Sequence, residues 1–168
     1  MSTATIGAGF RVAALPADEL ERIRARGVDD FGNALEPITV TEPGTPLRCC
    51  LRDAEPGERV ALIAYRPAAV GGPYAEVGPV FVHAEACAGY PDAARYPESF
   101  RARNQLLRAY DERGRQVENV IIDGPVAERA ITDLLGRPGV AYLHSRNVLA
   151  GCYMFAVHPA VEAGVTGS

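Results

Sequence analysis

The side chains best suited to chemistry stand at the end of an apolar run, in the segment GPVFVHAEAC at residues 78–87. If that run is an extended strand, alternate side chains share a face, so His83 and Glu85 point to the same side. A carboxylate beside a histidine fixes the imidazole tautomer and supports the charged ring, which suits a general base or a metal ligand. A polar pair at a half-exposed strand end would give the same pattern. We take His83 and Glu85 as candidate catalytic residues and leave the second interpretation open.

The His-x-Glu spacing is also that of the zinc-dependent nucleobase deaminases. Those enzymes need a Pro-Cys-x-x-Cys pair further along the chain, and no such pair follows Glu85. A metal site could draw on His83, Glu85, Cys87 and His144, but one short His-x-Glu-x-Cys run is a weak pattern beside a paired zinc motif. The sequence therefore predicts no metal ligands.

A second polar group follows residue 142, where the chain reads YLHSRN. In an extended segment Tyr142, His144 and Arg146 share one face, which makes His144 a further catalytic candidate. A guanidinium with neighbouring amide and hydroxyl groups suits recognition of an anion. The alternative is that these groups satisfy loop backbone, as Asn and Ser commonly do. The predicted ligand-binding residues are Arg48, Ser145, Arg146, Asn147 and Tyr153.

The four cysteines are expected to be free thiols in a reducing cytoplasm, because two are adjacent and their density is not that of a small secreted scaffold. If the segment LRCCL is a strand, Cys49 faces the core and Cys50 lies on the face of Arg48 and Arg52. Flanking cations favour a reactive thiolate, so Cys50 is the candidate nucleophile.

Charge and composition exclude several classes of function. A net charge of -4 with a pI near 5.4 argues against nucleic-acid and anionic-membrane partners. All 17 basic residues are arginine, so neither a pyridoxal phosphate Schiff base nor a Walker A nucleotide site is possible, and the cofactor stays unknown. No signal peptide and no run of about 20 apolar residues is present, which predicts a cytoplasmic protein.

The elements that position these residues follow from apolar periodicity and from glycine and proline. Pro16 and Gly27 bracket one expected helix, and Pro125 and Gly136 bracket another. We expect six to eight strands, several paired with near neighbours. They are drawn from nine candidate segments, at residues 10–15, 38–41, 47–51, 59–65, 78–85, 100–110, 116–122, 140–146 and 152–157. The fold class is therefore α+β, a single domain over residues 1–168 with a largely antiparallel sheet, two main helices, a core at about 10–157 and loose termini.

The segments PLRCCLR, GPYAEVGPVFVHAEAC, LLRAYDERG and VAYLHSRNVLAGCYMFAV resemble the bacterial family catalogued as domain of unknown function 1203 (DUF1203). The resemblance extends over residues 10–157. It implies a small, single-domain bacterial protein and supplies no reaction, cofactor or catalytic residue.

Our leading hypothesis is a small-molecule site for an anionic ligand, used by an acid/base or thiol enzyme. It requires six residues to converge at one sheet edge: Arg48, Cys50, His83, Glu85, His144 and Arg146. One alternative is a non-catalytic binding or self-assembly module, whose exposed hairpins pair in a homo-oligomer. Another alternative is a metal-binding protein.

Overall fold

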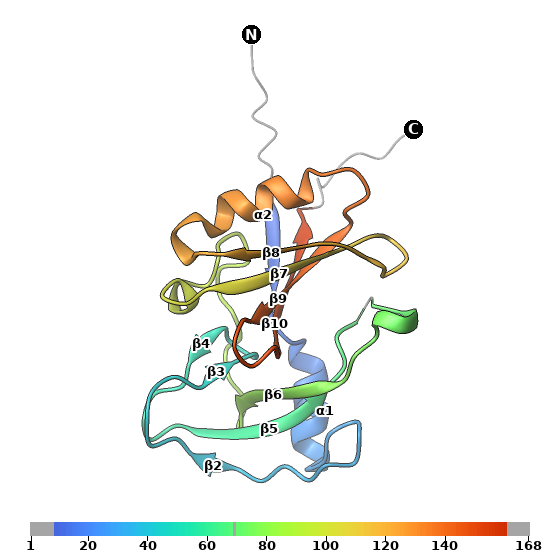
Figure 1. Ribbon diagram of the computed structural model, residues 1–168. Helices are drawn as coiled ribbons and strands as arrows, with labels where there is room; N and C mark the ends of the chain where they lie inside the picture. Colours follow the sequence, from blue (N-terminus) through green and yellow to red (C-terminus); the bar gives the residue numbers. More distant parts are fainter. Residues whose placement is uncertain (1–8, 69, 161–168) are drawn as a thin grey trace, which may run out of the picture.

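The computed structural model describes residues 9–68 and 70–160, so the expected loose termini lie largely outside the described residues. Two mostly antiparallel five-stranded sheets and two α-helices make up the fold (Figure 1). The predicted α+β class is confirmed. The ten strands exceed the expected six to eight because three of them are only two residues long. No helix in the described part of the chain is long and apolar enough to cross a membrane.

The first sheet has the strand order β1-β10-β9-β7-β8, and all its neighbours are antiparallel. Both hairpins expected from the sequence, β7 with β8 and β9 with β10, lie in this sheet. Residues 100–104 do not extend β7 as expected, because Phe100 belongs to a short 3-10 helix. The strands are β1 (Phe10–Ala13), β7 (Gln105–Tyr110), β8 (Gln116–Ile122), β9 (Tyr142–Asn147) and β10 (Tyr153–Pro159).

Helix α2 (Ala127–Leu135) covers one face of the first sheet (Figure 1). Ile131 and Leu134 of the helix join Phe155 of β10 in one hydrophobic cluster. The chain reaches the helix through Gly124, where an added Cβ would lie 1.9 Å from the carbonyl oxygen of Arg101. Only glycine fits this close backbone approach.

The second sheet has the strand order β2-β5-β6-β3-β4. Its strands are β2 (Ile38–Thr39), β3 (Pro46–Leu47), β4 (Arg52–Asp53), β5 (Arg59–Tyr65) and β6 (Gly78–His83). Its one parallel pairing joins β3 to β6 at Leu47 and Phe81. Helix α1 (Ala17–Arg26) packs its narrow apolar face, Leu20 and Ile23, into the same core as the strands.

Residues 48–51 of the segment LRCCL form a turn, so the prediction of a strand over 47–51 is wrong beyond Leu47. The backbone N–H of Leu51 donates to the carbonyl of Leu47 at 2.9 Å, and Leu51 has a positive φ of 56°. The reason is that β3 and β4, which are two residues long, pair with each other in antiparallel fashion. The four residues between them must therefore reverse the chain. The turn links the two cores, because Leu47 packs in the cluster of the second sheet and Leu51 in that of the first.

The two sheets meet through β10. Tyr153 and Ala156 of β10 belong to the cluster that also contains Val80 and Val82 of β6. The turn that carries Arg48 lies beside this contact, because Arg48 donates to the carbonyl of Tyr153.

Candidate metal centre and inter-sheet cavity

Four donor side chains form a compact cluster at the end of β6. Cys49, Cys50, His83 and Cys87 each offer one atom, and all four atoms lie within 4.8 Å of one another. The Sγ atoms of Cys49 and Cys50 are 3.9 Å apart, and Nδ1 of His83 is 3.5 Å and 3.8 Å from these two sulfurs. The sequence offered His83 and Cys87 as possible ligands of a weak metal pattern, whereas the participation of Cys49 and Cys50 is new.

Local backbone structure explains why adjacent cysteines reach one point. The turn between β3 and β4 keeps both Cys49 and Cys50 close to β6, whereas a strand would have sent them to opposite faces. Val80 and Val82 are buried on the other face of β6, as alternation predicts, which leaves His83 on the side of the turn. The backbone N–H of His83 donates to Sγ of Cys49 at 3.2 Å and fixes the two segments together.

The imidazole of His83 has different surroundings at its two nitrogens. Nδ1 faces the sulfurs, and Nε2 lies 3.1 Å from Oε1 of Glu58. Arg52 holds Glu58 through two hydrogen bonds of 2.8 and 2.5 Å, and the backbone N–H of Glu55 adds a third at 2.6 Å. The guanidinium of Arg52 is the main cause that holds the pKa of Glu58 far below its usual value, so this carboxylate stays ionised. Glu58 therefore orients the ring of His83.

The neighbouring thiols influence one another. The hydrogen bond from Cys49 lowers the pKa of Cys50, helped by the charge of Arg52 and opposed by burial. The same bond, together with burial, raises the pKa of Cys49. Burial also raises the pKa of the Cys87 thiol. Of the three thiols, Cys50 is the one that ionises most readily.

The cluster is reached from the surface. A shallow hollow of about 360 Å³ opens beside His83 and Cys87, while Cys49 and Cys50 are 3% and 9% exposed. Glu85 lines the hollow but does not join the cluster, because it forms an ion pair of 2.5 Å with Arg59 and is 59% exposed.

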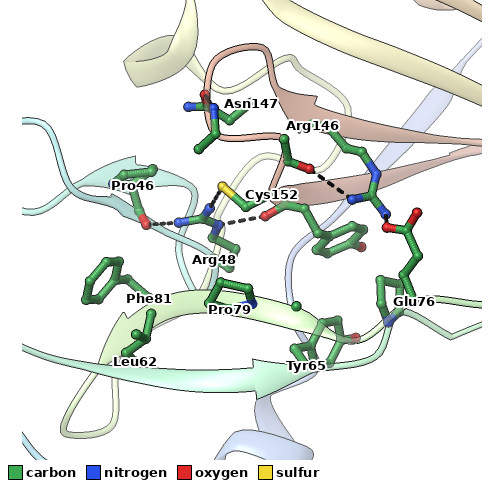
Figure 2. A pocket seen from close by; sticks show the side chains of 15 residues that line it. Pro46, Arg48, Leu62, Tyr65, Glu76, Pro79, Phe81, Arg146, Asn147 and Cys152 are labelled. Atoms are coloured by element: carbon green, nitrogen blue, oxygen red, sulfur yellow. Dashed lines mark hydrogen bonds and ion pairs between the residues drawn. The ribbon is translucent and has the colours of Figure 1, made fainter.

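A separate cavity of about 500 Å³ lies between the sheets (Figure 2). Four of the five predicted ligand-binding residues line it: Arg48, Arg146, Asn147 and Tyr153. The fifth, Ser145, is buried in β9 and donates to Gln105. The remaining lining residues are Pro46, Leu62, Tyr65, Pro67, Glu76, Gly78, Pro79, Phe81, Ala150, Gly151 and Cys152.

The two arginines of the cavity have different partners. Arg146 forms an ion pair of 2.6 Å with Glu76 and donates to the carbonyl of Gly151. Arg48 donates to the carbonyls of Tyr153 and Pro46 and to Sγ of Cys152, at 2.8, 2.5 and 2.8 Å (Figure 2). Arg48 thus links the turn of the second sheet to the start of β10 in the first.

The catalytic candidate His144 belongs to neither the cluster nor the lining of the cavity. It is 2% exposed and packs among the rings of Tyr110, Tyr142 and Tyr153 at centroid distances of 5.0 to 5.4 Å. Burial lowers the pKa of His144 to about 3, and the charge of Arg146 acts in the same direction. His144 is therefore a neutral ring in a core.

The six residues expected at one sheet edge fall into three groups. Cys50 and His83 meet in the cluster, with Glu85 at its surface; Arg48 and Arg146 line the cavity; His144 packs among aromatic rings. Sequence reasoning did not select Cys49, Glu58 and Cys152 for these places. The adjacent cysteines were the available signal, but their common direction depends on the turn that replaced the expected strand.

Comparison with known proteins identifies a family. No curated protein and no solved structure matches the chain. Residues 44–158 match the family described as protein of unknown function (DUF1203), a range that contains all four residues of the cluster and every residue that lines the cavity. Because this range is more than half of the 168 residues, the chain belongs to that family.

Proposed function

We propose that this protein binds a transition-metal ion through Cys49, Cys50, His83 and Cys87. The observation that carries the proposal is the grouping of three sulfurs and one imidazole nitrogen within 4.8 Å. His83 is then a metal ligand and not the proton carrier expected from the sequence.

The distances within the cluster support tetrahedral coordination. With Zn–S near 2.3 Å and Zn–N near 2.0–2.1 Å, a tetrahedral ion holds its sulfurs about 3.8 Å apart and sulfur and nitrogen about 3.6 Å apart. The corresponding separations are 3.9 Å between the sulfurs of Cys49 and Cys50, and 3.5 and 3.8 Å from these sulfurs to His83. These three separations therefore support a tetrahedral ion, and the sulfur of Cys87 lies within 4.8 Å of the same atoms.

The kind of donor points to the kind of metal. Three soft thiolates and one imidazole suit Zn²⁺ in preference to Mg²⁺ or Ca²⁺, which take oxygen ligands. Four protein ligands complete a tetrahedral shell, as in sites where zinc stabilises a fold. Glu58 supplies the carboxylate that commonly accepts from the second nitrogen of a metal-bound histidine.

The position of the ligands defines what such an ion would do. Cys49 and Cys50 lie in the turn between β3 and β4, His83 ends β6, and Cys87 lies in the irregular segment that follows. An ion bound by all four residues would hold the irregular segment of Cys87 against the turn of Cys49 and Cys50. We infer a stabilising metal centre.

Titration of the reduced protein with Co²⁺, which reports thiolate ligands through a charge-transfer band, tests the proposal. We expect a band that saturates at one equivalent. Cys87→Ser should weaken it strongly, whereas Cys152→Ser should leave it unchanged, because Cys152 lies in the cavity outside the cluster. Loss of the band in Cys152→Ser, or no band in the wild type, would refute the proposal.

The inter-sheet cavity supports a second candidate function, the binding of a small molecule. Its volume of about 500 Å³ lies within the range of about 300–1,000 Å³ typical of ligand pockets. A largely apolar wall with a few polar groups is also typical of such sites. Calorimetric titration of the protein with a small organic probe, without metal, tests whether the cavity binds small molecules.

A further inference from the structure

The inter-sheet cavity contains an unbalanced positive charge. Arg48, Arg146 and Glu76 are the ionic side chains among the residues that line it. Arg146 and Glu76 neutralise each other through their ion pair of 2.6 Å. Arg48 forms no ion pair with a carboxylate of the described residues, so the cavity carries one positive charge.

The positive charge of Arg48 is unusual because this residue is only 2% exposed. Its three partners are two carbonyl oxygens and the sulfur of Cys152, none of which is a carboxylate. A buried cation is costly unless a counter-charge and hydrogen bonds compensate it. Burial accordingly lowers the pKa of Arg48, and the sulfur of Cys152 opposes that shift.

The guanidinium of Arg48 retains binding capacity. It has five N–H groups, and three of them donate to the partners described above. The other two donate to no further group of the described residues, and Arg48 lines the cavity. Asn147 and Cys152 line the same end of the cavity and add polar atoms beside Arg48 (Figure 2).

Most of the remaining wall is apolar. Leu62 of β5, Phe81 of β6 and Pro79 lie below Arg48, and Tyr65 lies farther along the wall toward Glu76 (Figure 2). A ligand that satisfied only the charge of Arg48 would leave these side chains in contact with water. An apolar body on the ligand would bury them.

We propose that the cavity binds a small monocarboxylate with an aliphatic or aromatic body, and that Arg48 holds its carboxylate. This inference rests on the second candidate function above and is independent of the metal centre. It places the anion at Arg48, because Glu76 already neutralises Arg146, the residue that the sequence favoured for anion recognition.

Two probes of equal length, octanoate and its uncharged analogue octanamide, test the proposal by calorimetry. We expect octanoate to bind at least about tenfold more tightly, since charge-assisted hydrogen bonds to a buried guanidinium are strong. In ¹H–¹⁵N spectra, octanoate should shift the amides of lining residues such as Gly78 and Gly151. Equal affinities, or shifts confined to other surfaces, would overturn the proposal.

Substitutions test the role of Arg48 separately from that of the apolar lining. Arg48→Gln should bind the two probes with nearly equal affinity, whereas Arg59→Gln, which removes a charge that is 55% exposed and outside the cavity, should keep the preference for octanoate. If Arg48→Gln does not fold, Leu62→Trp serves instead, because Leu62 is 48% exposed and its enlargement should weaken both probes. A preference retained in Arg48→Gln, or undiminished binding of both probes in Leu62→Trp, would overturn the proposal.

The outcomes also distinguish the proposal from the function on which it rests. Octanoate and octanamide that bind equally would remove the role of Arg48 and leave small-molecule binding intact. If neither probe binds at millimolar concentration, both the second candidate function and this inference fail.

Discussion

Glu58 provides the sharpest test of the metal centre because it touches the cluster without belonging to it. The substitution Glu58→Gln removes the negative charge and keeps a side chain of the same size beside Nε2 of His83. We expect the affinity for Co²⁺ and Zn²⁺ to fall while the stoichiometry stays at one ion. The reason is that a carboxylate on the second nitrogen raises the basicity of a histidine ligand and fixes its ring.

The size of the effect follows from the contacts of Glu58. Loss of a carboxylate partner of a metal-bound histidine typically costs about 10–100-fold in affinity, which is about 1.4–2.8 kcal/mol. Two features act in opposite directions within this range. Arg52 lies 3.3 Å from Nε2 of His83 and would become an uncompensated cation there, whereas Glu58 is 26% exposed and partly screened by water.

The assay is competition for Co²⁺ between the protein and a chelator of known affinity. Glu85→Gln is the matched control, because this carboxylate borders the same hollow but pairs with Arg59. The reasoning is refuted if Glu58→Gln binds Co²⁺ as tightly as the wild type, or if Glu85→Gln weakens binding to the same extent.

Three further outcomes are expected. A chelator should lower the melting temperature of the metal-loaded wild type but not that of Cys49→Ser, since an ion at 100 times its dissociation constant contributes about 2.7 kcal/mol; equal shifts would count against a metal that stabilises the fold. Burial lowers the pKa of His144 to about 3 in the folded state, whereas an unfolded histidine has a pKa of about 6.5. Between these two pH values the unfolded state binds more protons than the folded state. The free energy of unfolding therefore falls by up to about 1.4 kcal/mol per pH unit as the pH decreases. Urea unfolding of His144→Phe at pH 7.5 and 5.5 should show a smaller loss than the wild type, and identical losses would contradict the buried neutral ring. Gly124→Ala should lower the free energy of unfolding by about 1–3 kcal/mol, because its Cβ would lie 1.9 Å from a carbonyl oxygen, whereas Gly78→Ala meets nothing within 4 Å and serves as the control.

Much of the fold could be predicted because its signals are local. Pro16 and Gly27 bracket α1, and Gly27 has the left-handed conformation that ends such helices. The turn around Gly114 closes the hairpin of β7 and β8, where Asp111 accepts from the backbone N–H groups of Arg113 and Arg115. The division into two sheets carried no local signal, because it depends on which hairpins pair at long range.

The candidate site was harder to predict because it depends on one turn. An extended LRCCL segment would place Cys49 and Cys50 on opposite faces, and the positive φ of Leu51 that allows the reversal is rare for a leucine. The polar residues of β9 stand out in the sequence, yet the sequence could not separate Arg146, which lines the cavity, from His144, which packs among tyrosines. Strand alternation placed both on one face, and only the packing of the second sheet distinguishes them.

The coordination shell itself tests the central claim most directly. X-ray absorption spectroscopy at the zinc edge of the loaded protein should report three sulfurs at about 2.3 Å and one nitrogen at about 2.0–2.1 Å. Cys152→Ser should give the same spectrum, because its sulfur is not a ligand. A shell of oxygen and nitrogen alone, or zinc well below one equivalent, would contradict a metal centre formed by Cys49, Cys50, His83 and Cys87.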